Sequence, residues 1–379
     1  MKKFLKLCVV VFVFIGLAGD AFGAGFALIE QSVKGLGTAV AGGSAVAEDA
    51  STVFFNPAGM TKIEGKQVLG GLHVIVPSTK FTAETATNAA GGSLGSDNGP
   101  DGGVVGVVPN LYYVETFDKG WSFGLGVNAP FGLATEYNKT WVGRYHAVES
   151  AVKTININPS AAHKVNDQFS YGFGLNIQYI DVVLSQMIDF GLAANPVALG
   201  SNPNADVFSE LTADDWSLGY NLGFLYEPSD KTRFGFAYRS EIEHELEGSA
   251  EFQIMNPGFL GGIPAPSPPY PAGTTLLDLA QAQFVNQGAS GKITLPANAS
   301  LSVYHDINSE FAIMADVTWT GWSSFDKLVI NFEGTLSGTP SVTTENWDDS
   351  MRYSVGGTYK PSEDWILRAG VAFDETPIP

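Results

Sequence analysis

The sequence is poor in charge and in cysteine. Only 16% of its 379 residues are charged, against about 25% in an average soluble protein. Acidic residues (39) outnumber lysine and arginine (20), giving a net charge of −19. This balance argues against nucleic acid as a partner, because binding phosphates needs clustered cations. The single cysteine, Cys8, excludes an internal disulfide and a cysteine-based metal site.

Long apolar runs are also missing beyond the N-terminus. After residue 20 no run of roughly 18 apolar residues occurs, so the sequence offers no transmembrane helix there. At the N-terminus, three lysines precede the apolar stretch 7–18, and Ala21 and Gly23 supply small residues before a cleavage point. This pattern predicts a secretory signal over residues 1–23, with an uncleaved anchor as the alternative.

The remaining chain alternates between large apolar and small or polar residues. In 171–179 the odd positions are Tyr, Phe, Leu, Ile and Tyr, and the even ones are Gly, Gly, Asn and Gln. The stretch 216–226 follows the same rule. Successive strand side chains point to opposite faces. A soluble sandwich alternates too, but long strands, a face rich in aromatics and a nearly uncharged opposite face favour a transmembrane antiparallel β-barrel.

Short and long connections also alternate along the chain. Turn-forming residues cluster at 117–120, 164–167, 227–230, 306–309 and 360–363, and long connections occupy 82–102, 138–148, 190–210, 253–288 and 334–343. Short periplasmic turns and longer outer loops are typical of outer-membrane barrels. Eleven strands are predicted, at 67–81, 103–117, 121–137, 149–164, 168–189, 211–227, 231–252, 289–306, 309–333, 344–360 and 364–373. An odd number leaves an open edge in lipid, so we expect a C-terminally truncated chain, or a count wrong by one.

Residues 24–66 do not alternate and are rich in glycine and other small residues. This composition predicts a compact segment packed inside the barrel, with a flexible periplasmic tail as the alternative. The expected organisation is a signal peptide (1–23), a hatch (24–66) and a barrel (67–379).

A series of motifs then points to a family. The motifs are Ala24-Gly25-Phe26, Gly35-Leu36-Gly37, Glu48-Asp49-Ala50, Asn56-Pro57-Ala58, Gly132–Tyr137, Trp141–Tyr145, Asn156–Pro159, Thr320–Ser323 and Ala372–Pro377. In order and spacing they resemble the FadL-type outer-membrane transporters of long-chain fatty acids, whose TodX branch carries aromatic hydrocarbons. The resemblance implies a barrel of about 14 strands, a luminal N-terminal hatch and a monomer in the outer membrane of a Gram-negative bacterium. It implies no catalytic residue, cofactor or metal.

The resemblance also implies where the ligand binds and leaves. The hatch and pocket residues are Ala24, Gly25, Phe26, Asn56, Pro57 and Ala58. The lateral exit is a kink of the third strand at Asn128, Ala129, Pro130, Phe131 and Gly132. Independently, a proline inside a closed sheet indicates a bulge or kink, because it cannot donate to the ladder. An ordinary strand break at a loop is the alternative.

Apolar residues in the outer loops predict a capture groove. They are Leu192, Phe208, Phe259, Leu260, Leu276, Leu277 and Phe284. Exposed apolar patches often bind ligands, although the same residues would also serve to pack the loops together. A buried carboxylate head group needs a cation, and Arg239, Arg352 and Arg368 are candidates. Asp181 stands where fatty-acid transporters are expected to carry a basic residue, which leaves uncharged hydrocarbons open.

The function predicted is outer-membrane transport of hydrophobic compounds, long-chain fatty acids first and aromatic hydrocarbons as the alternative. The expected partners are these small molecules and the surrounding membrane lipid and lipopolysaccharide. A lipase, an adhesin and a general diffusion porin are rival interpretations. The lipase is disfavoured because the Gly-x-Ser-x-Gly match at 91–95 lies in a predicted outer connection and not between a strand and a helix, and the five histidines lack metal-ligand spacing.

Overall fold

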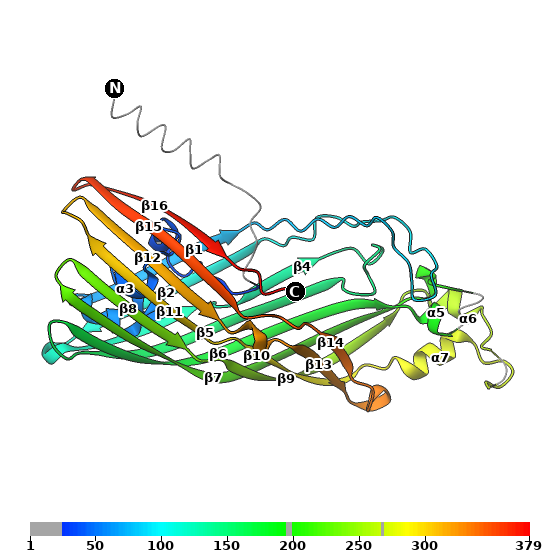
Figure 1. Cartoon of the computed structure of the whole chain (residues 1–379). Coiled ribbons are helices and arrows are strands. Elements are labelled where there is room, and N and C mark those ends of the chain that lie inside the picture. The colour runs from blue at the N-terminus through cyan, green and yellow to red at the C-terminus, as the bar shows by residue number, and fades with distance from the viewer. Residues whose placement is uncertain (1–24, 195–198, 267–268) are drawn as a thin grey trace, which may run out of the picture.

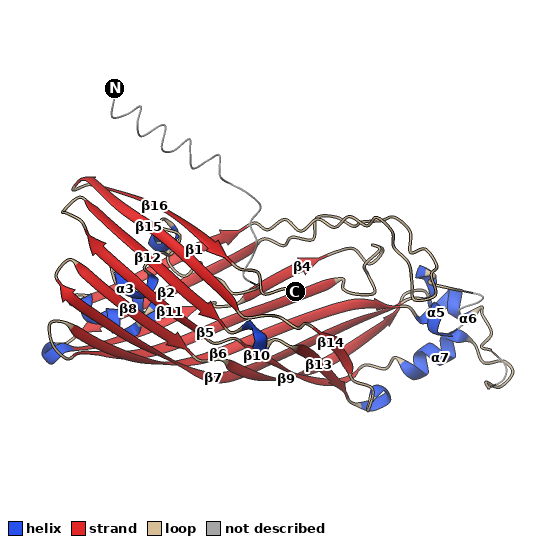
Figure 2. Cartoon of the chain, viewed as in Figure 1, coloured by secondary structure: helices blue, strands red, loops and turns tan. Residues whose placement is uncertain are grey.

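A computed structural model describes residues 25–194, 199–266 and 269–379, which form one long, strongly curled antiparallel sheet (Figures 1 and 2). The strands are β1 (Lys66–Ile75), β2 (Gly106–Thr116), β3 (Trp121–Asn128), β4 (Gly132–Glu136), β5 (Glu149–Lys164), β6 (Phe169–Ile188), β7 (Val207–Ser229), β8 (Thr232–Arg239), β9 (Ile242–Ile254), β10 (Gln287–Leu295), β11 (Asn298–Asp306), β12 (Phe311–Thr320), β13 (Lys327–Phe332), β14 (Ser341–Thr344), β15 (Ser350–Ser362) and β16 (Trp365–Asp374). The predicted signal peptide and Ala24 lie outside the described residues.

Neighbouring strands pair in chain order, as the hairpin pattern predicts. The main path runs β1-β2-β3-β5-β6-β7-β8-β11-β12-β15-β16 and thus contains eleven strands. Within the described ranges, β1 pairs only with β2 and β16 only with β15. The first strand begins at Lys66, one residue before the predicted start.

The sixteen strand segments differ from the predicted eleven because four predicted strands are divided and one short strand, β14, is added. The divided strands are β3/β4, β8/β9, β10/β11 and β12/β13. Pro130 and Pro296 lie in two of these breaks, where a missing N–H group interrupts the ladder. Arg239 is opposite Asn298, and Asn298 is opposite Thr320, so three of the breaks lie at one height of the wall.

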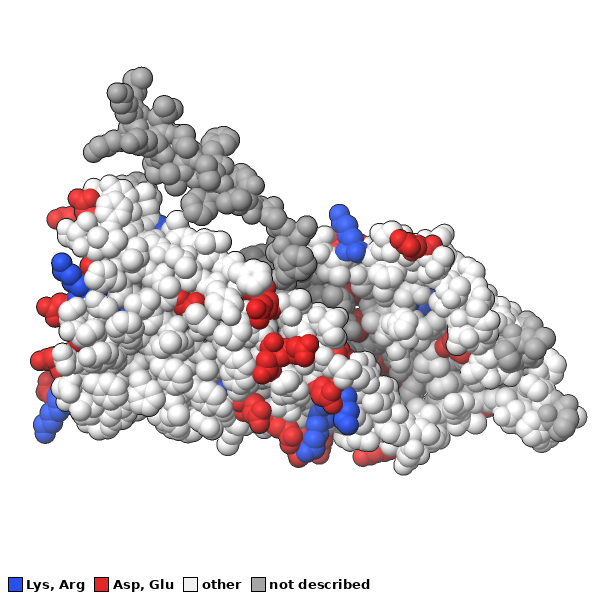
Figure 3. All heavy atoms as spheres, in the orientation of Figure 1, with Lys and Arg blue, Asp and Glu red and all other residues white. Residues whose placement is uncertain are grey.

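The two faces of the sheet divide as the alternation predicts. On β6, Tyr171 and Phe173 are exposed and Gly172, Gly174 and Asn176 are buried, and on β7 Trp216 and Leu218 are exposed and Ser217 and Gly219 are half-buried. In Figure 3 most of the sheet surface carries no charge. Charged atoms gather at the end with the short turns and in a band about midway along the molecule, toward the long connections. The outward stripe therefore has the composition of a lipid-facing surface.

Short turns lie at one end of the molecule and long connections at the other (Figure 1). The helical pieces of the connections are η2 (Asp118–Gly120), α5 (Phe190–Ala194), η3 (Pro203–Ala205), α6 (Pro257–Gly261), α7 (Leu276–Gln283), η4 (Trp322–Ser324) and η5 (Gly334–Leu336). None of the helices among the described residues is long and apolar enough to cross a membrane.

Residues 25–63, here called the N-terminal segment, lie against the inner face of the sheet. Its helical turns are α2 (Val33–Leu36), α3 (Gly43–Val46), α4 (Thr52–Phe55) and η1 (Pro57–Lys62). Turn α3 packs on β8 and β11, and η1 packs on β5, β6 and β7. The approach requires glycine: a Cβ atom on Gly235 would collide with the Ser44 carbonyl, and one on Gly370 with the Thr38 carbonyl. The predicted contact between this segment and the inner wall thus has a specific steric basis.

Candidate functional site

The break between β3 and β4 pairs with the start of the N-terminal segment. Leu28 donates its backbone N–H to the Pro130 carbonyl (2.9 Å), and Gly132 donates to the Phe26 carbonyl (2.9 Å). The Gln31 amide donates to the Ala129 carbonyl at 2.8 Å. The break is therefore a place where backbone groups leave the wall and bond to the segment inside it.

Phe26 lies at the centre of a cluster of aromatic rings next to this break. Its ring centroid is 4.8 Å from that of Trp322, 6.0 Å from Phe131, and 5.7 Å from both Phe325 and Trp347. These edge-on arrangements are the favoured geometry of aromatic pairs. The cluster is part of the largest buried core, which also contains Ile180, Val182 and Leu246 from the wall.

Gly25 fits this cluster only as glycine. Its φ angle is +59°, and a Cβ atom would lie 2.7 Å from the Trp347 ring and 2.8 Å from the Trp322 ring. Gly25 and Phe26 are predicted site residues, whereas Trp322, Phe325 and Trp347 are not among the residues predicted from the sequence. Trp322 and Phe325 lie within the predicted strand 309–333 and Trp347 near the start of the predicted strand 344–360, and neither pattern indicates Phe26 as their neighbour.

Asn56, Pro57 and Ala58 are buried where the segment crosses β6 and β7. The Asn56 amide donates to the Ser44 carbonyl (2.6 Å) and to the Phe224 carbonyl (3.0 Å), and its oxygen accepts from the Ala58 N–H (3.0 Å). This is the Asx-turn geometry expected of Asn before proline. The motif fastens the segment to the wall, and Pro57 alone of the three also lines the cavity described next.

A central cavity of about 130 Å³ separates the N-terminal segment from the wall. Leu28 and Phe55 line it from the segment, Pro130 and Phe131 from the break, and Arg239 from the wall. It therefore brings together predicted residues of three separate groups: the hatch, the strand break and the head-group candidates.

The three candidate arginines have different surroundings. Arg352 pairs with Asp374 at 3.4 Å and donates to the Ala39 carbonyl at 2.7 Å. Arg368 pairs with Glu48 at 3.0 Å. Arg239 is only 5% exposed, and no carboxylate of the described residues lies within ion-pair distance of it.

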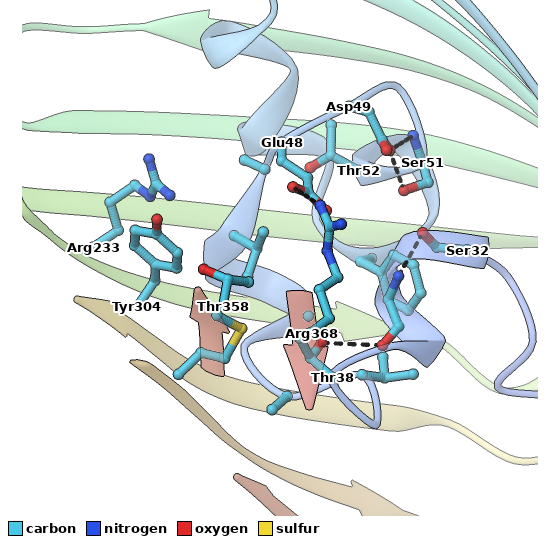
Figure 4. A pocket seen from close by; sticks show the side chains of 18 of the residues that line it. Ser32, Thr38, Glu48, Asp49, Ser51, Thr52, Arg233, Tyr304, Thr358 and Arg368 are labelled. Carbon is cyan, nitrogen blue, oxygen red and sulfur yellow. Dashed lines mark hydrogen bonds and ion pairs between the residues drawn. The ribbon is translucent and has the colours of Figure 1, made fainter. Parts of the chain in front are cut away.

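Arg368 belongs to a second cavity, nearer the short turns, which Figure 4 shows from close by. Glu48 points toward Arg368, and Arg233 lies over the Tyr304 ring, 4.1 Å from its centroid. Arg233 also donates to the Ala45 carbonyl at 3.1 Å. This second cavity is lined by ion pairs and hydroxyl groups, and thus offers less apolar surface than the central one.

The predicted capture-groove residues divide into two groups. Leu260 and Leu276 are fully buried and form the core of the outer loops with Phe190 and Val207. Phe259, Leu277 and Phe284 are partly buried against that core. Leu192 and Phe208 are half-exposed, and the Lys139 ammonium lies 3.3 Å from the centroid of the Phe208 ring. Leu260 and Leu276 therefore hold the loops together rather than lining their surface.

Asp181 does not face the lumen. From Ser170 to Val182 of β6 the even positions are buried and the odd ones face outward, so Asp181 shares the outward face with Tyr179. Its carboxylate therefore carries no information about the luminal pocket. Asp181 is therefore no argument against a carboxylate ligand, and that prediction is wrong. The period-two alternation of 171–179, continued by two residues, already places Asp181 on the outward face.

His244 is completely buried in the inner wall. Its Nδ1 atom is 2.8 Å from an Asp215 carboxylate oxygen, and its Nε2 atom is 3.1 Å from the Gln178 amide oxygen. Both ring nitrogens are thus occupied by polar partners. Over the described ranges, no group of three His, Cys, Asp or Glu residues is arranged to hold a metal ion.

A buried ion pair in the outer loops was missed by sequence reasoning. Arg144 donates to Asp206 at 3.0 Å, and both side chains are 2% exposed or less. The Tyr145 hydroxyl donates to the other Asp206 oxygen at 2.8 Å. Burial raises the pKa of Asp206, and the hydrogen bonds from Arg144 and Tyr145 oppose that rise. The pair joins two outer connections that are far apart in the sequence.

Comparison with known proteins gives consistent matches. Residues 14–379 match the family described as outer membrane protein transport protein (OMPP1/FadL/TodX). The long-chain fatty acid transport protein of Escherichia coli K12 is 28% identical over 382 residues, which cover 96% of this chain and 81% of that protein. The crystal structure of a Pseudomonas aeruginosa FadL homologue superposes with a TM-score of 0.75 at 28% identity, covering 94% of this chain and 82% of the other. The toluene transporter TbuX of Ralstonia pickettii shares the fold, with a TM-score of 0.64 at 20% identity, 88% of this chain and 84% of the other being covered.

Proposed function

Because this chain belongs to the OMPP1/FadL/TodX family of outer membrane transport proteins, we propose that it carries long-chain fatty acids across the outer membrane through its lumen. The ligand first binds to apolar side chains of the outer loops. It then enters the central cavity and leaves sideways at the break between β3 and β4. Burying a methylene group is worth about 0.8 kcal/mol, so a long alkyl chain binds well to apolar walls.

The observation that carries this proposal is the pairing between the N-terminal segment and the strand break. The carbonyls of Ala129 and Pro130 have their partners on Gln31 and Leu28, not on the neighbouring strand. If the segment shifts when a ligand enters, these carbonyls lose hydrogen bonds worth about 0.5–1.5 kcal/mol each. Movement of the segment and opening of the wall are thereby coupled, which suits ligand-triggered release.

Two further features support the route. The central cavity is lined by the break residues Pro130 and Phe131 themselves. The cluster around Phe26 separates this cavity from apolar space higher in the lumen, lined by Leu184, Leu211 and Ile330. A hydrophobic ligand arriving from the loops therefore meets apolar surface at each stage.

Uptake by cells tests the proposal. A Gram-negative strain without its own transporter of this kind, carrying the complete gene, is expected to take up labelled oleate faster than the same strain with an empty vector. A parallel assay with toluene tests the alternative ligand, an aromatic hydrocarbon. Uptake of toluene but not of oleate would favour an aromatic hydrocarbon as the ligand. If neither compound enters the cells, the proposed transport of hydrophobic compounds is refuted.

A further inference from the structure

Four polar side chains form a row across the inner wall at the central cavity. They are Asn221 on β7, Arg239 on β8, Asn298 on β11 and Thr320 on β12, and all four line the cavity. The strand register places each directly opposite the next. Residues opposed in this way have Cβ atoms about 4.5–5.5 Å apart. We call these residues the polar row.

Arg239 brings a charge to this row that its neighbours do not neutralise. Its guanidinium donates to the Phe54 carbonyl at 3.0 Å and to the side-chain oxygen of Asn176. It lies over the Phe54 ring, 4.5 Å from the centroid. These partners are uncharged, and a buried cation without a counter-charge is costly. A bound anion would remove that cost.

The acidic residues of the same cavity are occupied elsewhere. Asp316 lies four residues below Thr320 on β12, about 13 Å along the strand. It accepts hydrogen bonds from Ser302 and from Thr318, the latter at 2.6 Å. Asp374 pairs with Arg352. The carboxylates therefore lie at the lower end of the cavity, and Arg239 lies at the upper end.

Asn221 adds a free hydrogen-bond donor beside Arg239. Its oxygen accepts from Asn158 (2.9 Å) and Asn176 (3.3 Å), but its nitrogen has no partner although the residue is only 2% exposed. A buried donor without an acceptor costs about 1–3 kcal/mol. An unpaired amide donor next to a guanidinium without a counter-charge is an arrangement that a ligand with two acceptor oxygens satisfies.

We propose that the polar row binds the carboxylate of an anionic amphiphile, held by Arg239 and Asn221, and thereby selects fatty acids over neutral hydrocarbons. The inference rests on the proposed function, because it assumes that ligand enters this cavity. The apolar tail lies along Leu28, Phe55 and Phe131, which line the same space. A hydrocarbon can occupy the apolar part but leaves Arg239 without a counter-charge and the Asn221 nitrogen without an acceptor.

Binding to the purified, detergent-solubilised full chain tests this site. The ligands are oleic acid and oleyl alcohol, which share one tail and differ in charge. Substitution Arg239→Met is expected to weaken oleate binding about tenfold or more, since a charge-assisted bond is lost, and to change oleyl alcohol binding by less than about threefold. Arg239→Lys keeps the charge and is expected to retain most of the oleate affinity.

Arg352→Met is the matched control, because Arg352 lines the same cavity but already has a carboxylate partner. An equal loss of acid and alcohol in Arg239→Met, or an equally selective loss in Arg352→Met, overturns the site. If Arg239→Met fails to fold, as judged by gel mobility before and after heating, Asn221→Ala replaces it and is expected to weaken oleate selectively.

The wild-type chain separates failure of this site from failure of the proposed function. If cells take up both oleate and toluene through the protein, but the purified protein binds oleate no better than oleyl alcohol, the polar row is not a head-group site and the proposed transport function stands. If cells take up neither oleate nor toluene through the protein, both the site and the proposed function are overturned.

Discussion

The inner wall carries glycine where the N-terminal segment comes closest. At Gly235 the Ser44 carbonyl occupies the space of a side chain, and the Ser44 hydroxyl donates to the Gly235 carbonyl at 3.1 Å. Glycine in a strand interior normally weakens the strand. Here it permits a contact between two elements that no larger residue allows.

Replacing this glycine is expected to displace turn α3. Gly235→Val should lower the free energy of unfolding by about 1–3 kcal/mol, the usual cost of overpacking. Gly70→Val is the matched control, because a Cβ atom on Gly70 meets nothing within 4 Å. Denaturant unfolding followed by tryptophan fluorescence measures both. Equal stability of the two variants would contradict the close contact.

The buried Arg144–Asp206 ion pair is expected to stabilise the outer loops. Asp206→Ala leaves a buried guanidinium without its counter-charge and is expected to cost about 3–5 kcal/mol. The loss should also expose the connection around residue 206 to proteases. Asp167→Ala removes a fully exposed carboxylate from the Lys164 pair and is expected to leave the stability almost unchanged, because solvent screens such a pair. Similar proteolysis of the two variants would count against the structural role of the buried pair.

At the scale of elements, the break between β3 and β4 depends on the N-terminal segment as much as on Pro130. Proline explains why the ladder cannot continue, but not where the freed backbone groups find partners. Ala27 and Phe131 form an isolated antiparallel bridge between the two elements. A single contact of this kind is a natural point at which to fix the elements together.

A disulfide between these positions is expected to stop transport. Ala27 and Phe131 lie opposite each other without hydrogen bonds between them, the antiparallel arrangement in which side chains come closest. The only native cysteine is Cys8. In Ala27→Cys/Phe131→Cys cells, oxidation should reduce oleate uptake to the empty-vector level, and a reductant should restore it. The two single variants serve as controls, and undiminished uptake with the disulfide formed would separate segment motion from transport.

For the whole molecule, we expect the N-terminal segment to keep the lumen closed. Its turns pack against nine of the described strands, β1, β2, β3, β5, β6, β7, β8, β11 and β12. A water-filled barrel of this width would conduct ions as porins do. With the segment in place, we expect a blocked lumen.

Conductance in planar bilayers measures this directly. The full chain is expected to give little or no steady current, and deletion of residues 25–63 should produce open-channel currents. Gly70→Val, which changes only the outward face, is the control and should remain blocked. A full chain that conducts freely would favour the general diffusion porin and refute the blocked lumen.

The sequence by itself determined the architecture. Period-two alternation in 171–179 and 216–226, together with alternating short and long connections, predicts antiparallel strands with an outward apolar face, and β6 and β7 have that face. These signals are local, since side-chain direction and turn chemistry depend on residues a few positions apart. The same local rule places Asp181 outside the lumen. Pro130 likewise marks a strand break within its own neighbourhood.

Only the tertiary structure decided which residues make the site. Phe26 meets Trp322, Gln31 meets Ala129, and Asn221 stands beside Arg239, although none of these partners is close in sequence. Whether an arginine has a carboxylate partner depends on what the neighbouring strand or the N-terminal segment places beside it, which separates Arg239 from Arg352 and Arg368. Such pairings arise from long-range register and from the packing of the N-terminal segment. A sequence pattern records which face a side chain is on, but not what lies across from it.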